Sequence, residues 1–221
     1  IFAPETYQYK KGHLNVEDLA TNPIDQFQRW FSDSKTQKSQ ADLVIPEAAT
    51  FSTASLPSGR ISLRIVLFKE LDQDGFIVYS NWDKSKKAGD YETNKYASLT
   101  FFWPYLERQV RVEGIMEKVD RLTLERYFKT RPRGSKIGAW SSPQLQVIQD
   151  RSELDELYKK NEERFKDLAD DEIPCPELWG GMRIVPLSVE FWQGGNSRLH
   201  DLLIFERDEV DQKWKVVRRA P

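Results

Sequence analysis

The sequence predicts a predominantly β fold of the α+β class, in which hairpins form an antiparallel sheet or barrel and helices lie at its periphery. Two observations support this prediction. Apolar, β-branched runs occur in pairs around turn residues, and segments with helical periodicity stand between the pairs. Strands grouped in this way favour an antiparallel sheet or barrel over a doubly wound parallel sheet.

The N-terminal part of the chain divides into an arm and the start of a domain. Residues 1–20 show little apolar periodicity and are expected to form an extended arm, followed by a single domain over residues 21–221. A chain of this length buries one core and is short for two. Asn22 offers an N-cap and Pro23 a first helical residue for an amphipathic helix that ends near Ser34.

Two hairpins are expected in the first half of the domain. Arg60–Lys69 and Phe76–Tyr79 flank an Asp- and Gly-containing turn and are predicted to pair. Ala97–Trp103 and Gln109–Val119 form the second predicted hairpin. The polar segment between them, Ser85–Asn94, is expected to form a short helix.

The second half of the chain is expected to hold two helices and then three strands. Asp120 can cap a helix that carries Tyr127 and Phe128, and the segment Ser152–Asp155 resembles a capping box that opens another helix. The predicted strands of the tail are Arg183–Trp192, Arg198–Arg207 and Trp214–Arg218.

Composition excludes several classes of protein. The 33 basic and 35 acidic residues nearly balance, which argues against a nucleic-acid binder. No apolar run is long enough to cross a membrane. The single cysteine, Cys175, rules out an internal disulfide framework, and with only His13 and His200 we expect no metal site. This cysteine usage fits a reducing compartment, and we expect the cytoplasm, with a mitochondrial location left open.

One segment concentrates groups that bind phosphate. Tyr127–Lys136 holds four cationic residues and several hydroxyls at a helix end broken by Pro132 and Gly134. Arginine offers a planar fork for phosphate oxygens, and hydroxyls add donors. If the helix runs through Arg131, that residue shares a face with Tyr127. On composition alone, phosphate binding and a solvated helix end are about equally supported.

Two further basic features have competing explanations. Strand alternation places Lys69 on the apolar face of Arg60–Lys69 and Arg64 on the other face. An edge lysine that snorkels to solvent is favoured there over a ligand contact. The segment Lys84–Lys87 lies at the start of the expected short helix. Its backbone donors and ammonium groups would attract a phosphate there, but a solvated basic turn is equally consistent with the sequence.

A glycine turn near the C-terminus introduces the last candidate site. The turn at Gly194–Gly195 is expected to lead into a strand on which Arg198, His200 and Leu202 share a face. Two potential cations side by side are unfavourable in a core, which favours a functional site over a structural role.

These segments together resemble the pyridoxine (pyridoxamine) 5′-phosphate oxidase family, and fungal members in particular, over nearly the whole chain. The motifs that recur in this order in the family are Arg64–Lys69 (RIVLFK), Glu107–Val110 (ERQV), Tyr127–Ser135 (YFKTRPRGS), Ile137–Trp140 (IGAW), Phe191–Gly194 (FWQG) and Arg198–Asp201 (RLHD).

The resemblance implies an FMN-binding split β-barrel that forms a homodimer with FMN at the subunit interface. The residues it assigns to FMN are Arg64, Ile65, Val66, Leu67, Tyr79, Ser80, Lys86, Lys87, Gln109, Gln144, Leu145, Trp192 and Leu202. The residues it assigns to the substrate phosphate are Lys69, Tyr127, Arg131 and Ser135. Arg198 and His200 are implied as substrate-binding and catalytic residues over the reacting end of the pyridine ring, and Tyr9 as an arm residue that closes over substrate.

The resemblance also implies the reaction. Pyridoxine or pyridoxamine 5′-phosphate loses hydrogen from C4′ to flavin N5, and pyridoxal 5′-phosphate results. Oxygen then reoxidises the flavin and gives hydrogen peroxide, in vitamin B6 salvage and biosynthesis. The flavin carries the redox chemistry, so the protein supplies orientation and charge.

Three residues depart from the family pattern. Leu202 occupies a position where the family usually has an arginine that contacts FMN. Leu145 replaces a serine that is usual in the family, and Lys86 replaces an arginine that is frequent there. Two rival functions follow: a catalytically impaired split-barrel protein that binds flavin or pyridoxal phosphate, and a flavin reductase with a nicotinamide donor. The presence of Arg198, His200 and the whole Tyr127–Ser135 segment argues against both.

Overall fold

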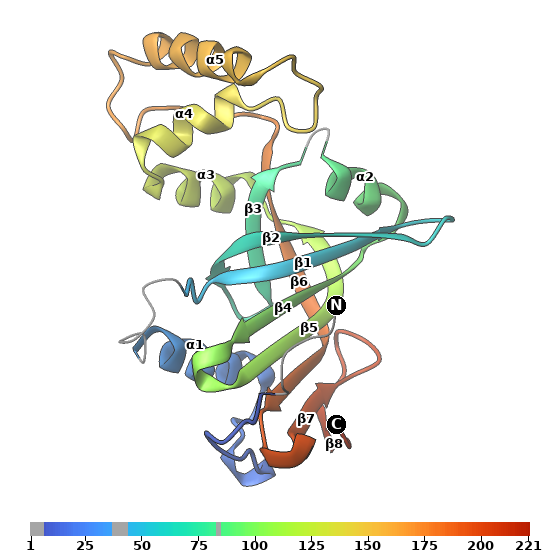
Figure 1. Ribbon diagram of the computed structural model, residues 1–221. Helices are drawn as coiled ribbons and strands as arrows, with labels where there is room; N and C mark the ends of the chain where they lie inside the picture. The colour runs from blue at the N-terminus through green and yellow to red at the C-terminus, as the bar shows by residue number, and fades with distance from the viewer. Residues whose placement is uncertain (1–6, 37–43, 83–84) are drawn as a thin grey trace.

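The computed structural model describes residues 7–36, 44–82 and 85–221 (Figure 1). Its strands are β1 (Ala48–Ser55), β2 (Arg60–Leu71), β3 (Phe76–Asn81), β4 (Tyr96–Trp103), β5 (Arg108–Lys118), β6 (Trp179–Gln193), β7 (Asp201–Glu206) and β8 (Lys215–Arg218). Its helices are α1 (Pro23–Thr36), α2 (Lys86–Thr93), α3 (Arg121–Thr130), α4 (Arg133–Ser141) and α5 (Arg151–Arg164), with 3₁₀ turns η1 (Val16–Asp18), η2 (Pro104–Leu106) and η3 (Asn196–Arg198).

The described strands form one antiparallel sheet that closes on itself. Their order is β3-β2-β1-β4-β5-β6-β7-β8, and β3 also pairs with β6. The first half of β6 pairs with β3 and its second half pairs with β7. The barrel is split at the point where the pairing of β6 changes from β3 to β7. The predicted split β-barrel with peripheral helices is confirmed, and the two predicted hairpins are the pairs β2–β3 and β4–β5.

An aromatic core joins α1 to the barrel. Phe27 of α1 is fully buried, and its ring centroid lies 5.5 Å from that of Phe68 and 4.8 Å from those of Phe76 and Phe101. The predicted start of α1 is correct, because the Asn22 side chain accepts a bond from the Asp25 amide at 2.9 Å. None of the described helices is both long and apolar enough to span a bilayer.

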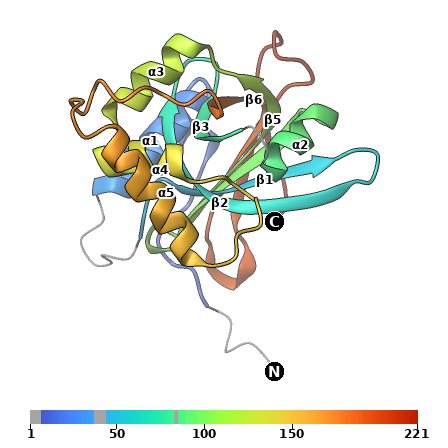
Figure 2. The same ribbon diagram turned by 90° about the horizontal axis from the view of Figure 1, so that it is seen from above.

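Helices α3, α4 and α5 lie together (Figures 1 and 2), at the end of the molecule opposite to β7 and β8 (Figure 1). Asp120 caps α3 as predicted, accepting a bond from the Thr123 amide at 2.9 Å. The helix α4 was not predicted, because Gly134 and Ser135 have low helix propensity. The proposed cap at Ser152 was wrong: α5 is capped by Asp150, which accepts a bond from the amide of Ser152 at 2.8 Å.

The predicted strand over Arg198–Arg207 was also wrong at its start. The ladder with β6 begins at the pair of Gln193 with Asp201, and the residues between them form a tight connection. A Cβ on Gly195 would lie 2.2 Å from the Leu199 carbonyl oxygen, so the chain folds back on itself there. Arg198 belongs to η3 with a positive φ of 64° and is outside the strand.

The apolar face of β2 points outward rather than into the barrel. Ile61, Leu63 and Ile65 are 74%, 68% and 66% exposed, and Leu67 is exposed as well. The alternate side chains of the strand face inward, where Phe68 is buried. A contiguous row of exposed aliphatic side chains is characteristic of a surface that another molecule covers.

Candidate functional site

The segment between α3 and α4 forms one wall of a cavity of about 430 Å³. Pro132 disfavours helical geometry in the residue before it, so α3 stops at Thr130 and Arg131 is extended, with ψ of 147°. The condition for a shared helical face of Tyr127 and Arg131 is therefore not met, yet both residues line the cavity. The residues around it are Ile65, Val66, Leu67, Lys69, Tyr79, Ser80, Tyr127, Thr130, Arg131, Pro132, Ser135 and Trp179.

A stack of aromatic rings positions Tyr127 and Arg131. The ring of Tyr127 is stacked on Tyr79 with centroids 4.1 Å apart, and Tyr79 in turn on Trp179 at 5.5 Å. The Arg131 guanidinium lies over Trp179, 4.8 Å from its centroid. Burial raises the pKa of Tyr127, so its hydroxyl keeps its proton and remains a donor. Trp179, which the sequence reasoning missed, completes the stack.

Arg131, which lines this cavity, has an unsatisfied donor. Its Nη1 is buried and has no hydrogen-bond partner among the described residues, and burial lowers the pKa of the guanidinium. A buried cationic donor without a partner is costly unless an acceptor meets it. Lys69 lines the same cavity, with its Nζ 3.7 Å from the Glu47 carboxylate. The cavity thus presents cations and hydroxyls suited to a phosphate.

A second cationic group lies between β2, α2 and the loop after α4. The Arg64 guanidinium donates to Thr53 Oγ1 at 2.8 Å and to Ser62 Oγ at 2.6 Å. Lys87 is buried and donates to the Gln144 side chain at 3.0 Å. Burial, followed by repulsion from Arg64, lowers the pKa of Lys87 to about 8.

The other residues predicted to bind FMN in this part of the molecule lie around Arg64 and Lys87. Lys86 pairs with Asp90, a buried carboxylate that also accepts bonds from Thr53 and Ser62. Leu145 follows Gln144 in a left-handed conformation and is exposed. Lys84 lies outside the described residues. The buried or half-buried cations outnumber the neighbouring carboxylate, so this region carries a local positive charge that would favour an anion.

The remaining predicted residues lie at the opposite end of β6. Gln109, Trp192 and Leu202 stand opposite one another on β5, β6 and β7, so their side chains share a face. The His200 ring lies 4.7 Å from that of Trp192, although His200 precedes the strand. Its Nδ1 accepts a bond from the Gly195 amide at 3.1 Å, which leaves Nε2 as the protonated nitrogen of the neutral ring.

Arg198 and His200 line a second cavity, of about 360 Å³, beneath the N-terminal arm. Its walls are formed by Tyr7, Gln8, Tyr9, Trp192, Gly195, Arg198 and His200. The Arg198 side chain does not share a strand face with His200 and Leu202, as the sequence reasoning proposed, because η3 lifts it out of the ladder. It nevertheless reaches the same cavity as His200.

The two cavities are far apart within one chain. Tyr79, which lines the first cavity, pairs with Gly181 on β6, and Trp192 follows eleven residues later on the same strand. At about 3.3 Å per residue, this is a path of roughly 35 Å along the strand. Figure 1 shows α3 and α4 at one end of the molecule and β7 at the other. One chain therefore does not bring the predicted phosphate-binding residues and Arg198 or His200 together.

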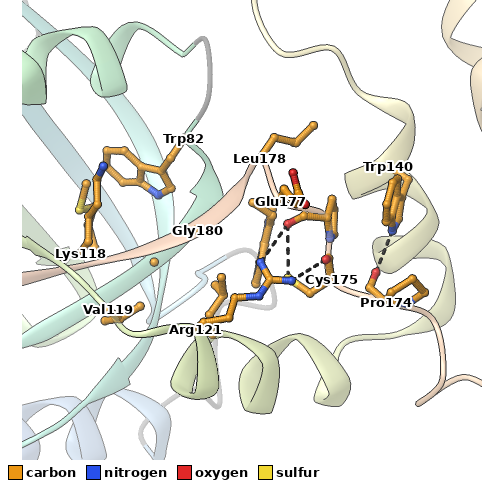
Figure 3. Close-up of a pocket in the computed structure, with 15 residues that line it drawn as sticks. Trp82, Lys118, Val119, Arg121, Trp140, Pro174, Cys175, Glu177, Leu178 and Gly180 are labelled. Carbon is orange, nitrogen blue, oxygen red and sulfur yellow. Dashed lines mark hydrogen bonds between the residues drawn. The ribbon is translucent and has the colours of Figure 1, made fainter.

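A larger cavity, of about 930 Å³, also has Trp179 in its wall and contains none of the predicted site residues (Figure 3). The Arg121 guanidinium donates to the Cys175 carbonyl at 2.7 Å, and Trp140 Nε1 to the Pro174 carbonyl at 2.8 Å. Burial raises the pKa of the Cys175 thiol to about 11, so it stays protonated. These bonds fix residues 174–178 against α3 and α4, which is a structural role.

Comparisons with known proteins found two family models that match parts of this chain. Residues 36–156 match the family described as "Pyridoxamine 5′-phosphate oxidase", and residues 179–221 match "Pyridoxine 5′-phosphate oxidase C-terminal dimerisation region". The pyridoxamine 5′-phosphate oxidase of Saccharomyces cerevisiae is 61% identical over 221 residues, which is 100% of this chain and 95% of that protein. The pyridoxine/pyridoxamine 5′-phosphate oxidase of Paraburkholderia xenovorans is 44% identical over 96% of this chain and 95% of that protein.

A solved structure supports the fold. PhzG from Burkholderia lata, in complex with tetrahydrophenazine-1-carboxylic acid, superposes with a TM-score of 0.82 at 24% identity, over 93% of this chain and 95% of that one. The matched family spans over half of the chain and the two relatives nearly all of it, in agreement with the resemblance seen in the motifs. The chain belongs to the pyridoxamine 5′-phosphate oxidase family.

Proposed function

We propose that this protein oxidises pyridoxine 5′-phosphate and pyridoxamine 5′-phosphate at C4′ to pyridoxal 5′-phosphate, with O₂ as acceptor and H₂O₂ as product. The observation that carries this proposal is the buried, unpartnered Nη1 of Arg131, a residue that lines one cavity with Lys69, Tyr127 and Ser135. A substrate phosphate supplies the acceptor that this donor lacks. The names and full-length similarity of the two relatives support the same reaction, within vitamin B6 biosynthesis and salvage.

The phosphate serves as a handle remote from the reacting carbon. Lys69 and Arg131 neutralise its charge, and the hydroxyls of Tyr127 and Ser135 fix its orientation. Because Tyr127 is stacked on Tyr79 and Arg131 on Trp179, the grip is rigid before substrate arrives. Pre-positioned contacts of this kind convert binding energy into orientation of the reacting group.

The residues present fit FMN as the cofactor. Arg64, Lys86 and Lys87 supply cations for its phosphate, and the low pKa of Lys87 indicates a group that gains stability from an anion. The other residues proposed to line the FMN site are Ile65, Val66, Leu67, Tyr79, Ser80, Gln109, Gln144, Leu145, Trp192 and Leu202. Bound FMN supplies the hydride acceptor and, through its reaction with O₂, the turnover.

Arg198 and His200 act on the other end of the substrate. Nε2 of His200 is free to contact the oxygen or nitrogen on C4′, because Nδ1 is held by the Gly195 amide. The Arg198 guanidinium lines the same cavity and adds a positive charge that orients this substituent. The Tyr9 ring packs against His200 and, with substrate bound, would limit access of water to the reacting carbon.

A second copy of the chain brings together the two parts of the site, the phosphate cavity of one chain and Arg198 and His200 of the other. The exposed row Ile61, Leu63, Ile65 and Leu67 borders the phosphate cavity and offers an apolar surface for that copy. The match of residues 179–221 to a dimerisation region adds support, since it covers β6, β7 and β8. In this homodimer, FMN lies at the interface, with the phosphate grip from one chain and Arg198 and His200 from the other.

We further propose residues 1–20 as an arm on a single domain of residues 21–221, in a protein of the cytoplasm. The arm is supported by residues 7–15, which form neither helix nor strand; residues 1–6 lie outside the described part of the chain. The cytoplasmic location is supported by the free Cys175, which suits a reducing compartment.

The first prediction tests the reaction. Purified protein loaded with FMN should show a yellow flavin spectrum that bleaches anaerobically when pyridoxamine 5′-phosphate is added, and recovers when oxygen is admitted. A flavin that never bleaches would favour the catalytically impaired protein that only binds flavin or pyridoxal phosphate. Bleaching by a reduced nicotinamide but not by pyridoxamine 5′-phosphate would favour the flavin reductase.

The second prediction tests the shared site. Arg131→Ala and His200→Ala should each abolish most activity, but co-expression of the two variants should restore about a quarter of it. Half of the randomly paired dimers are then mixed, and each mixed dimer has one intact site of two. Activity that stays at the level of the single variants would show that each chain holds a complete site.

The third prediction concerns Lys87 and pH. Its lowered pKa means that the cation is present below about pH 8 in the FMN-free protein and is lost above it. The Kd for FMN should therefore rise as pH increases from 7 to 9, as measured by quenching of flavin fluorescence. Lys87→Arg should remove this rise and keep tight binding, whereas Lys87→Met should bind weakly at every pH.

The fourth prediction concerns Leu202. It stands opposite Trp192 in the β6–β7 pair, so an arginine there would reach the same face. Leu202→Arg should lower the Kd for FMN by about tenfold or more, the value of a hydrogen bond to a charged group. Val210→Arg adds the same charge in the loop after β7 and should change nothing. An unchanged Kd for Leu202→Arg would contradict this account.

A further inference from the structure

Tyr9 of the N-terminal arm packs in a defined position against the cavity that His200 lines. The ring of Tyr9 lies 5.1 Å from that of Trp192 and 5.5 Å from that of His200. A Cβ on Gly194 would come within 2.6 Å of Cγ of Tyr9, so only glycine allows the ring to approach this closely. The position of Tyr9 is therefore specific rather than a loose contact.

Glu107 binds the arm on both sides of Tyr9. Its carboxylate is buried, with 1% of the residue exposed, and accepts three hydrogen bonds from the arm. Oε1 accepts from the Tyr7 hydroxyl at 2.9 Å, and Oε2 accepts from the amides of Lys10 and Lys11 at 2.6 and 2.8 Å. Bonds to an ionised carboxylate are roughly twice as strong as bonds between neutral groups.

The carboxylate is ionised while it holds the arm. Burial by itself would raise the pKa of Glu107, but the donors from the Lys11 amide, the Tyr7 hydroxyl and the Lys10 amide outweigh burial and lower it. Glu107 also has a left-handed backbone, with φ of 55°, and its carbonyl accepts a bond from the Gly194 amide at 2.8 Å. The same residue thus joins the arm to the turn on which Tyr9 rests.

A second carboxylate holds the base of the arm. Asp201 accepts bonds from the Leu14 amide at 3.0 Å and from Arg218 at 2.6 Å, and His13 Nδ1 lies 3.3 Å away. The arm residues in these contacts, His13 and Leu14, are C-terminal to Tyr9. Near Tyr9, Lys11 Nζ also donates to the Tyr105 carbonyl. Loss of the Glu107 contacts would therefore loosen the part of the arm that carries Tyr9 and leave the base attached.

We propose that Glu107 is a positioning residue that latches the arm closed and thereby sets how tightly the enzyme retains substrate. It acts through Tyr9 and lies outside both the phosphate cavity and the cationic group of Arg64 and Lys87. Its effect on substrate rests on the proposed function, whereas its effect on the arm does not.

Tryptic cleavage of the FMN-loaded enzyme measures the latch directly, because Lys10 and Lys11 are held by Glu107. Glu107→Gln keeps the shape and removes the charge, and cleavage after Lys10 and Lys11, followed by mass spectrometry, should be about tenfold faster. Tyr7→Phe removes one donor from an exposed arm residue and should give a smaller increase. Glu113→Gln, on the strand β5 that follows Glu107 and paired with Arg111, should match the unaltered enzyme.

Steady-state kinetics measure the consequence for substrate. The KM for pyridoxamine 5′-phosphate should rise about tenfold in Glu107→Gln and less in Tyr7→Phe, with kcat not reduced and the Kd for FMN unchanged. If Glu107→Gln fails to fold, Tyr7→Phe carries both measurements, since its change lies outside the barrel.

Two results would overturn the proposal. Unchanged cleavage at Lys10 and Lys11 in the folded variants would show that the arm is held without Glu107. Faster cleavage with an unchanged KM would show that the arm opens without affecting substrate. An unaltered enzyme with no turnover would instead refute the proposed function, and the cleavage rates would still decide whether Glu107 is a latch.

Discussion

The length of β6 is the constraint on which the rest of the site depends. Its first half pairs with β3 and begins at Trp179 beside Arg131, whereas its second half pairs with β7 and carries Trp192 beside His200. An extended strand of fifteen residues cannot shorten to bring its ends together. The two cavities therefore lie near opposite ends of β6, and the proposed reaction needs a dimer to bring them together.

The structure concentrates desolvated cations where phosphate is proposed to bind. Burial lowers the pKa of Arg64, Lys87 and Arg131, and among them Arg131 has a donor with no partner in the described chain. These groups oppose folding unless an anion compensates them. The aromatic core around Phe27 supplies the stability that offsets this cost. Binding of the phosphates would therefore also stabilise the fold.

Local patterns in the sequence predicted most of the elements, and they failed where distant contacts decide. Pro132 ended α3 one residue earlier than the shared face of Tyr127 and Arg131 required, yet both side chains line one cavity. The strand proposed from Arg198 was too long, because the ladder starts only where Gln193 finds its partner Asp201. Helix α4 was missed, because its stability comes from buried Ile137 rather than from helix propensity.

The sequence by itself determined the paired strands and the family, because each depends on residues close together in the chain or on motifs in a fixed order. Only the tertiary structure decided the distance between the two halves of the proposed site, the outward apolar face of β2, and the contacts of Glu107 with the arm. The bonds from Glu107 to Lys10 and Lys11 span 97 and 96 residues. No periodicity or spacing encodes such a contact, because it exists only once the barrel has closed and brought η2 under the arm.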